Sequence, residues 1–242
     1  MEQIPSNSPM MGPASGASGW LPVWIKAVTK PNEQTFIEIT SSPEVSSKTA
    51  FIWVFIAGTL SGLVTGLIQM ALLAAGVQSQ GLGQFSGAAG RGIGAGLGIA
   101  ICGAPVYGLI SVIGLAIGAA IIQWIAKLFG GTGTFEKMTY AIAAISAPIT
   151  VVTMFLTPLS AIPYLGICTG LLSFGIALYA IFLEITAVKA VNSFGWGPAI
   201  GSVLLPVVVI GLVCGCIFGV GVALLGPKIA DVFRQINQGL TP

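Results

Sequence analysis

The stretch AFIWVFIAGTLSGLVTGLIQMALLAA, residues 50–75, decides the fold of this chain. It contains no charged residue, and a helix rising about 1.5 Å per residue would extend it over about 39 Å. The hydrocarbon core of a bilayer is about 30 Å thick, so the stretch is long enough to cross it with some tilt. We therefore expect a transmembrane helix here.

The composition of the whole chain agrees with a membrane environment. Of 242 residues, 55% are hydrophobic and only 7% are charged, whereas a soluble domain carries about 25% charged residues. A net charge of +2 without a basic tract gives no reason to expect a nucleic-acid partner. Membrane lipids are the expected surroundings.

Four further apolar segments predict four more spans, within residues 94–128 and at about 135–159, 164–191 and 198–225. Backbone polar groups in hydrocarbon must be paired internally, and the segments lack the alternation of a β-barrel, so we expect helices. The predicted fold is an all-α polytopic membrane protein, a bundle of five transmembrane helices with interfacial amphipathic helices at both ends.

The regions outside the spans divide into three parts. Residues 1–19 are rich in Ser, Pro and Gly and show no signal-peptide pattern, so we expect a disordered polar tail. Residues 20–47 predict short cytoplasmic interfacial helices anchored by Trp20, Trp24, Lys26 and Lys30. The membrane domain then covers residues 48–226, and residues 227–242 predict an amphipathic tail with an apolar stripe.

The basic residues predict an orientation. With the N-terminus in the cytoplasm, six basic residues fall inside and three outside, which favours this arrangement by the positive-inside rule. The inside group is Lys26, Lys30, Lys48, Lys127, Lys137 and Lys189, and the outside group is Arg91, Lys228 and Arg234. Five spans then place the C-terminus outside.

The segment GGTGTFEKMTYAIAAISAPI, residues 130–149, has the glycines and lysine of a phosphate-binding loop but not their spacing. A P-loop needs lysine directly after the last glycine, whereas Thr134 follows Gly133 and Lys137 comes later. We instead expect a cytoplasmic turn between two spans, with a left-handed cap at Gly130 or Gly131 and an N-cap at Thr134.

Several segments together resemble the Yip1 domain family, most closely its bacterial members. They are KPNEQTFIEITSSP (residues 30–43), GGTGTF (130–135), SAPI (146–149), IPYLG (162–166), ALYAIFLEITAVKAV (177–191) and LLPVVV (204–209). The resemblance covers residues 20–225 and implies five membrane helices, a cytoplasmic N-terminus and no known catalytic activity. Eukaryotic relatives act in vesicle trafficking through Rab GTPases and form oligomers. This chain lacks the acidic N-terminal motif of that branch, and its amphipathic tail extends beyond the family pattern.

Small residues spaced four apart favour close helix packing in lipid. One stripe lies on the first span at Gly58, Gly62 and Gly66, and another lies on the fifth at Gly211, Gly215 and Gly219. Two interpretations stay open for these stripes. They pack the five helices against one another, or one of them faces outward and contacts a partner protein.

Glu184 is the most unusual residue of the predicted spans. It lies about 10 Å along the axis from the end of the fourth span, where an ionised group is costly. Two interpretations stay open. Glu184 either reaches the interface or pairs with Lys127 or Lys137, or it binds a proton, an ion or a partner protein.

We expect no catalytic, cofactor-binding or metal-binding residues. The chain has no histidine, and its cysteines (Cys102, Cys168, Cys214 and Cys216) lie in apolar segments as small buried residues. No nucleophile–base arrangement is visible, so an enzyme is not expected.

The predicted function is that of a Yip1-like scaffold or adaptor in the bacterial cytoplasmic membrane. Its partners would be other integral membrane proteins, as a homo-oligomer or within a complex. One alternative is an accessory structural subunit of a larger membrane complex, and a second is a small-solute channel or transporter.

Overall fold

The structure is a computed structural model that describes residues 17–74, 93–161 and 164–216. It consists of helices, and no strand occurs in those three ranges. The elements in chain order are α1 (Ala17–Thr29), α2 (Glu33–Ser41), α3 (Ser47–Ala74), α4 (Ile93–Leu128), α5 (Phe135–Leu156), the 3₁₀ turn η2 (Pro158–Ala161) and α6 (Leu165–Asn192). A further helix covers Trp196–Cys216.

Five helices are long and apolar enough to cross a membrane, which confirms the predicted fold class. Their spans are Ser47–Ala71, Ala100–Leu128, Phe135–Ser160, Leu165–Asn192 and Trp196–Cys216. The third predicted start agrees with the structure, and the first lies three residues too late because hydropathy marks the apolar segment and not the polar first turn of the helix. The predicted fifth span continues beyond Cys216, outside the described residues.

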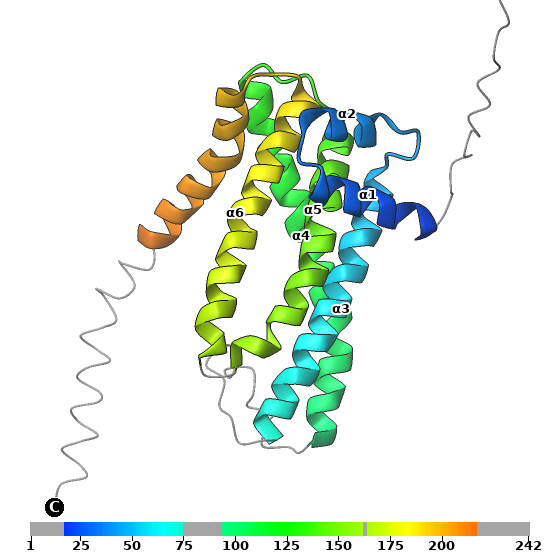
Figure 1. Ribbon diagram of the computed structural model, residues 1–242, viewed down its shortest axis with the longest axis vertical. Coiled ribbons are helices and arrows are strands. Elements are labelled where there is room, and N and C mark those ends of the chain that lie inside the picture. The colour runs from blue at the N-terminus through cyan, green and yellow to red at the C-terminus, as the bar shows by residue number, and fades with distance from the viewer. Residues whose placement is uncertain (1–16, 75–92, 162–163, 217–242) are drawn as a thin grey trace, which may run out of the picture.

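The helices form an elongated bundle with α5 near its centre (Figure 1). α3 packs against both α4 and α5, and α6 packs against α5. Four alanines explain how α3, α4 and α6 approach α5 so closely, because each is at most 1% exposed and adds only a methyl group to the interface. They are Ala141, Ala143, Ala144 and Ala147.

The two short helices α1 and α2 lie against one end of the bundle. The same end carries the α4–α5 turn and the C-terminus of α6 (Figure 1). α1 begins at Ala17, inside the tail that we expected over residues 1–19. Lys26, Lys48 and Lys137 therefore lie towards one end of the molecule, as the antiparallel order of the spans requires.

Large apolar side chains cover much of the outer surface, as expected where lipid is the solvent. Leu109, Ile110, Leu171 and Leu212 are each more than half exposed. The cysteines belong to this surface too, because all four are free and exposed. Our expectation that they are buried was wrong: hydropathy does not separate a side chain in lipid from one in a protein core.

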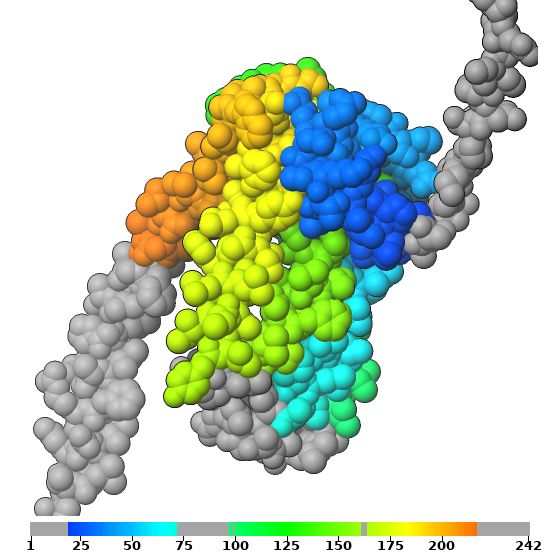
Figure 2. All heavy atoms as spheres, in the orientation of Figure 1, coloured from blue at the N-terminus to red at the C-terminus, as the bar shows by residue number. Residues whose placement is uncertain are grey.

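The helix Trp196–Cys216 leans away from the bundle as it leaves the α6 junction (Figure 1). Near the junction Ala199, Ser202 and Val203 are buried, whereas all residues from 207 to 216 are exposed. Figure 2 shows this helix as a separate arm along the side of α6. Within the described residues, only the first half of the arm packs on the rest of the protein.

Candidate functional site

An aromatic cluster fixes α1 onto the bundle. Trp53 of α3 is 1% exposed and contacts Trp20 and Trp24 of α1, with ring centroids 6.1 and 5.8 Å apart. Tyr140 of α5 also contacts Trp53, at 4.8 Å between centroids. Edge-to-face aromatic pairs contribute about 0.5–1.5 kcal/mol each beyond the area they bury, so α1 is a packed part of the protein.

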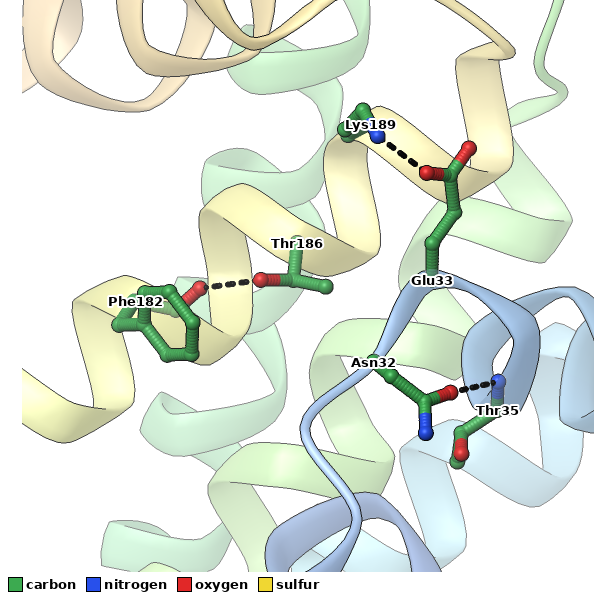
Figure 3. Close-up of polar contacts among 6 residues, drawn as sticks. All are labelled: Asn32, Glu33, Thr35, Phe182, Thr186 and Lys189. Atoms are coloured by element: carbon green, nitrogen blue, oxygen red, sulfur yellow. Dashed lines mark hydrogen bonds and ion pairs between the residues drawn. The ribbon is translucent and has the colours of Figure 1, made fainter.

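Polar contacts join α1 and α2 to α6. Figure 3 shows the ion pair between Glu33, at the start of α2, and Lys189 of α6. The Lys189 ammonium also lies 5.0 Å from the ring centroid of Trp196, a cation–π distance. The Tyr179 hydroxyl donates a hydrogen bond of 2.5 Å to the Val28 carbonyl. The start of the fifth span and the N-terminal helices thus share Lys189 as a contact.

The four predicted anchors occupy different environments. Trp20 and Trp24 pack on Trp53, and Lys26 pairs with Glu38 of α2 at 2.5 Å, so three of the four make contacts within the protein. Lys30 is exposed. The outward face of α1 carries Leu21 and Ile25, 59% and 54% exposed, which the sequence analysis did not single out.

The turn at residues 130–134 has the predicted geometry. Gly130 adopts φ +87°, the left-handed conformation that ends a helix at little cost only for glycine. The Thr134 side chain accepts a hydrogen bond from the Lys137 N–H, as an N-cap does, and Glu136 lies in the first turn of α5. Both predicted caps are confirmed.

The remaining glycines of this turn surround a buried amide that the sequence analysis missed. Asn192, the last residue of α6, is 1% exposed, and its Oδ1 accepts hydrogen bonds of 3.1 Å from the Gly133 N–H and from Gln123 Nε2. Gln123 Nε2 also donates to the Gly133 carbonyl at 2.6 Å. We call Gln123, Gly133 and Asn192 the amide clamp, because they join α4, the turn and α6.

The clamp explains why Gly131 and Gly133 cannot carry side chains. A Cβ on Gly131 would lie 2.5 Å from Asn192 Oδ1, and one on Gly133 would lie 2.7 Å from Val191 Cγ1. These glycines therefore allow the turn to approach α6, a structural use that differs from phosphate binding. A polar residue at the end of an apolar helix was the available signal for Asn192.

The glycine stripe on α3 lies against α4. A Cβ on Gly58 would come within 2.8 Å of Ser111 Oγ, and Cβ atoms on Gly62 and Gly66 would lie 3.1 and 3.0 Å from Tyr107 and Ala100. Gly108 of α4 approaches the same helix, because its Cβ would lie 2.8 Å from the Phe55 carbonyl oxygen. Within the molecule, α4 therefore covers this stripe.

The stripe on the fifth span has different surroundings. No described atom lies within 4 Å of a Cβ built on Gly211 or Gly215, and both positions are exposed. Gly219, the third member, and the expected amphipathic tail at 227–242 lie outside the described residues. The described part of this stripe is therefore open on the outer surface of the molecule.

Glu184 of α6 lines a cavity of about 360 Å³ between α3, α4, α5 and α6, and this cavity is open to the surface. The ion pairs of the described residues are Lys26–Glu38 and Lys189–Glu33, so neither Lys127 nor Lys137 pairs with Glu184 there. Ser111, Ser146 and Thr150 contribute hydroxyl groups to the same cavity. Within the described residues, no cluster of three His, Cys, Asp or Glu residues could hold a metal ion.

These features define a polytopic α-helical membrane protein with a docked N-terminal helix pair at one end of the bundle. The chain belongs to the Yip1 domain family, whose model matches residues 25–217 and so includes every predicted span at least in part. The family is not known for enzymatic activity. Searches of curated proteins and of solved structures find no match to this chain.

Proposed function

We propose that this protein is a non-enzymatic scaffold or adaptor that holds other integral membrane proteins through contacts between helices. One observation carries the proposal: the second half of the helix Trp196–Cys216 is exposed on all sides among the described residues and presents Gly211 and Gly215. The stripe of the same spacing on α3 is filled by α4, which supports the proposal that the exposed stripe accepts a helix of another protein.

The opposite end of that helix supports an adaptor role. Trp196 contacts Lys189, which pairs with Glu33 of α2, so the arm begins where the N-terminal helices dock. The first residues of the arm therefore join it to the end of the bundle that carries α1 and α2. We further propose that the protein lies in the bacterial cytoplasmic membrane, with the α1–α2 end facing the cytoplasm.

The test compares glycine substitutions on two helices. The Gly211→Ile/Gly215→Ile variant is expected to lose most of the membrane protein that co-purifies with the wild type after cross-linking in mild detergent. The matched control is Gly170→Ile/Gly175→Ile on α6, because those glycines also have no described atom within 4 Å of a Cβ. Equal recovery by the two variants would contradict a docking role for the arm.

The stoichiometry of the recovered complex separates the two related functions. Partial and salt-sensitive recovery supports an adaptor, whereas a fixed ratio that persists through purification supports an accessory subunit of a larger complex. A homo-oligomer appears in the same experiment as recovery of a second, differently tagged copy of this chain.

A further inference from the structure

We propose that the cavity beside Glu184 is a binding site for one small monovalent cation, either an alkali metal ion or a small primary ammonium. This proposal is independent of the scaffold function. It rests on the composition of the cavity wall, on the absence of a counter-charge in the described residues and on a hydroxyl group that lacks a partner.

The wall of the cavity combines one acidic group with hydroxyl oxygens. Glu184 comes from α6, Ser111 from α4, and Ser146 and Thr150 from α5, while the other lining residues are apolar or glycine. Carboxylate and hydroxyl oxygens are ligands for hard cations, and no nitrogen or sulfur side chain lines the cavity to favour a transition metal.

Two polar groups in the cavity lack an ion-pair or hydrogen-bond partner. No described residue pairs with the Glu184 carboxyl, although charges inside membrane domains normally have partners. The Ser146 Oγ atom is buried and makes no hydrogen bond to any described residue. Buried polar atoms are nearly always satisfied, by protein, water or an ion, so a bound species would complete both groups.

The single negative charge restricts the ligand, and the volume of the cavity permits one that is hydrated. A single carboxylate neutralises one positive charge, whereas a divalent ion would leave a net charge in an apolar environment. The cavity of about 360 Å³ is larger than a bare ion, since one water molecule takes about 30 Å³ of liquid volume. An alkali ion that keeps several water molecules fits this space, and so does a small organic ammonium.

The ligand would lie inside the membrane domain but within reach of one end. Glu184 precedes Asn192, the last residue of α6, by eight positions, or about 12 Å along the helix axis. Gly114 and Gly118 of α4 also line the cavity, and no described atom lies within 4 Å of a Cβ built on either. Because glycine has no side chain, this wall of the cavity leaves room for a ligand.

The test measures thermal unfolding of the full chain in detergent at constant ionic strength. Na⁺, K⁺ or methylammonium replaces N-methylglucamine, a secondary ammonium several times larger than any of the three. We expect at least one small cation to raise the unfolding midpoint saturably, by about 3 °C or more. Comparison of the three ions identifies whether an alkali ion or an ammonium is the preferred species.

Glu184→Gln should abolish the response, while Ser146→Ala should raise the half-saturating concentration several-fold. Glu44→Gln is the matched control, because Glu44 is exposed and lies outside the spans, and its response should equal that of the wild type. If Glu184→Gln does not fold, Glu184→Asp and Ser146→Ala must both shift the half-saturating concentration. No response of the wild type, or an unchanged response in the cavity variants, would overturn the proposal.

Discussion

Asn192 holds three segments together with one side-chain amide. Its Oδ1 accepts from the turn and from α4, and its Nδ2 donates to the Val188 carbonyl at 3.1 Å. In a bundle whose other contacts are mostly apolar, such a group fixes the relative position of α4, α5 and α6, because any slip leaves buried polar atoms without partners.

Replacement of Asn192 by leucine should destabilise the folded state by about 1–3 kcal/mol, since the Gly133 N–H and the Gln123 amide would stay buried without this acceptor. Thermal unfolding in detergent measures the change. The double variant Asn192→Leu/Gln123→Leu should lose less than the sum of the two single variants, because the two amides bond to each other. Simple additivity would show that they do not act as a unit.

Alanine at Gly133 should also destabilise, by about 1–3 kcal/mol, because its Cβ would overlap Val191 and the Asn192 amide. The matched control is Gly103→Ala in α4, where a Cβ meets no described atom within 4 Å. That variant should unfold at or above the wild-type temperature, because alanine favours helix more than glycine does. Equal unfolding temperatures for the two variants would contradict the close approach of the turn to α6.

At the scale of elements, the spans could be predicted from sequence but their neighbours could not. Apolar length and the absence of charge identify a span locally, so all five were predicted correctly. Glu33 and Lys189 are 156 residues apart, and Gln123 and Asn192 are 69 apart. A single sequence shows which residues share a helix face but not which helix that face meets, so these pairs escaped prediction.

The same limit applies to Trp20, Trp24 and the two glycine stripes. Tryptophan is favoured both at a membrane interface and in an aromatic cluster, so its presence in residues 20–47 could not reveal the contacts with Trp53. The stripes on α3 and on the fifth span have identical spacing. Only the packed structure shows that α4 fills the first and that no described helix fills the second.

Docking of α2 should depend on the sign of the charges at its first turn. Glu33→Lys or Lys189→Glu should weaken docking, since each variant places like charges together, and the double exchange should restore much of it. An ion pair at partly exposed positions contributes up to about 1 kcal/mol, which is about a five-fold change in the undocked population. Proteolysis in the α1–α2 linker measures that population.

Lys48→Glu is the control for this series, because it makes the same change in charge as Lys189→Glu at an exposed residue outside both the linker and the ion pairs of the described chain. Its cleavage rate should equal that of the wild type. A similar rate in the wild type and all four variants would show that the ion pair does not contribute to docking of the N-terminal helices.

At the scale of the whole molecule, one end of the bundle gathers most of the polar structure. α1, α2, the amide clamp and the two ion pairs all lie at the end where α6 finishes. The opposite half exposes large apolar side chains such as Ile167, Leu171 and Phe174. The two ends of the bundle are therefore stabilised differently, by polar contacts at the clamp end and by apolar packing at the other.

This asymmetry leads to a test of orientation. Of nine basic residues in the chain, six lie on helices or linkers at the clamp end, so we expect this end in the cytoplasm. In a background without the native cysteines, a membrane-impermeant maleimide should label Ser160→Cys in intact cells and Thr132→Cys only after permeabilisation. Both positions are exposed, and η2 places Ser160 at the end opposite the α4–α5 turn.

The reverse labelling pattern would show the opposite orientation, with the α1–α2 surface outside the cell. Equal labelling of both sites in intact cells would contradict an α5 that crosses the membrane, because the two positions flank that helix.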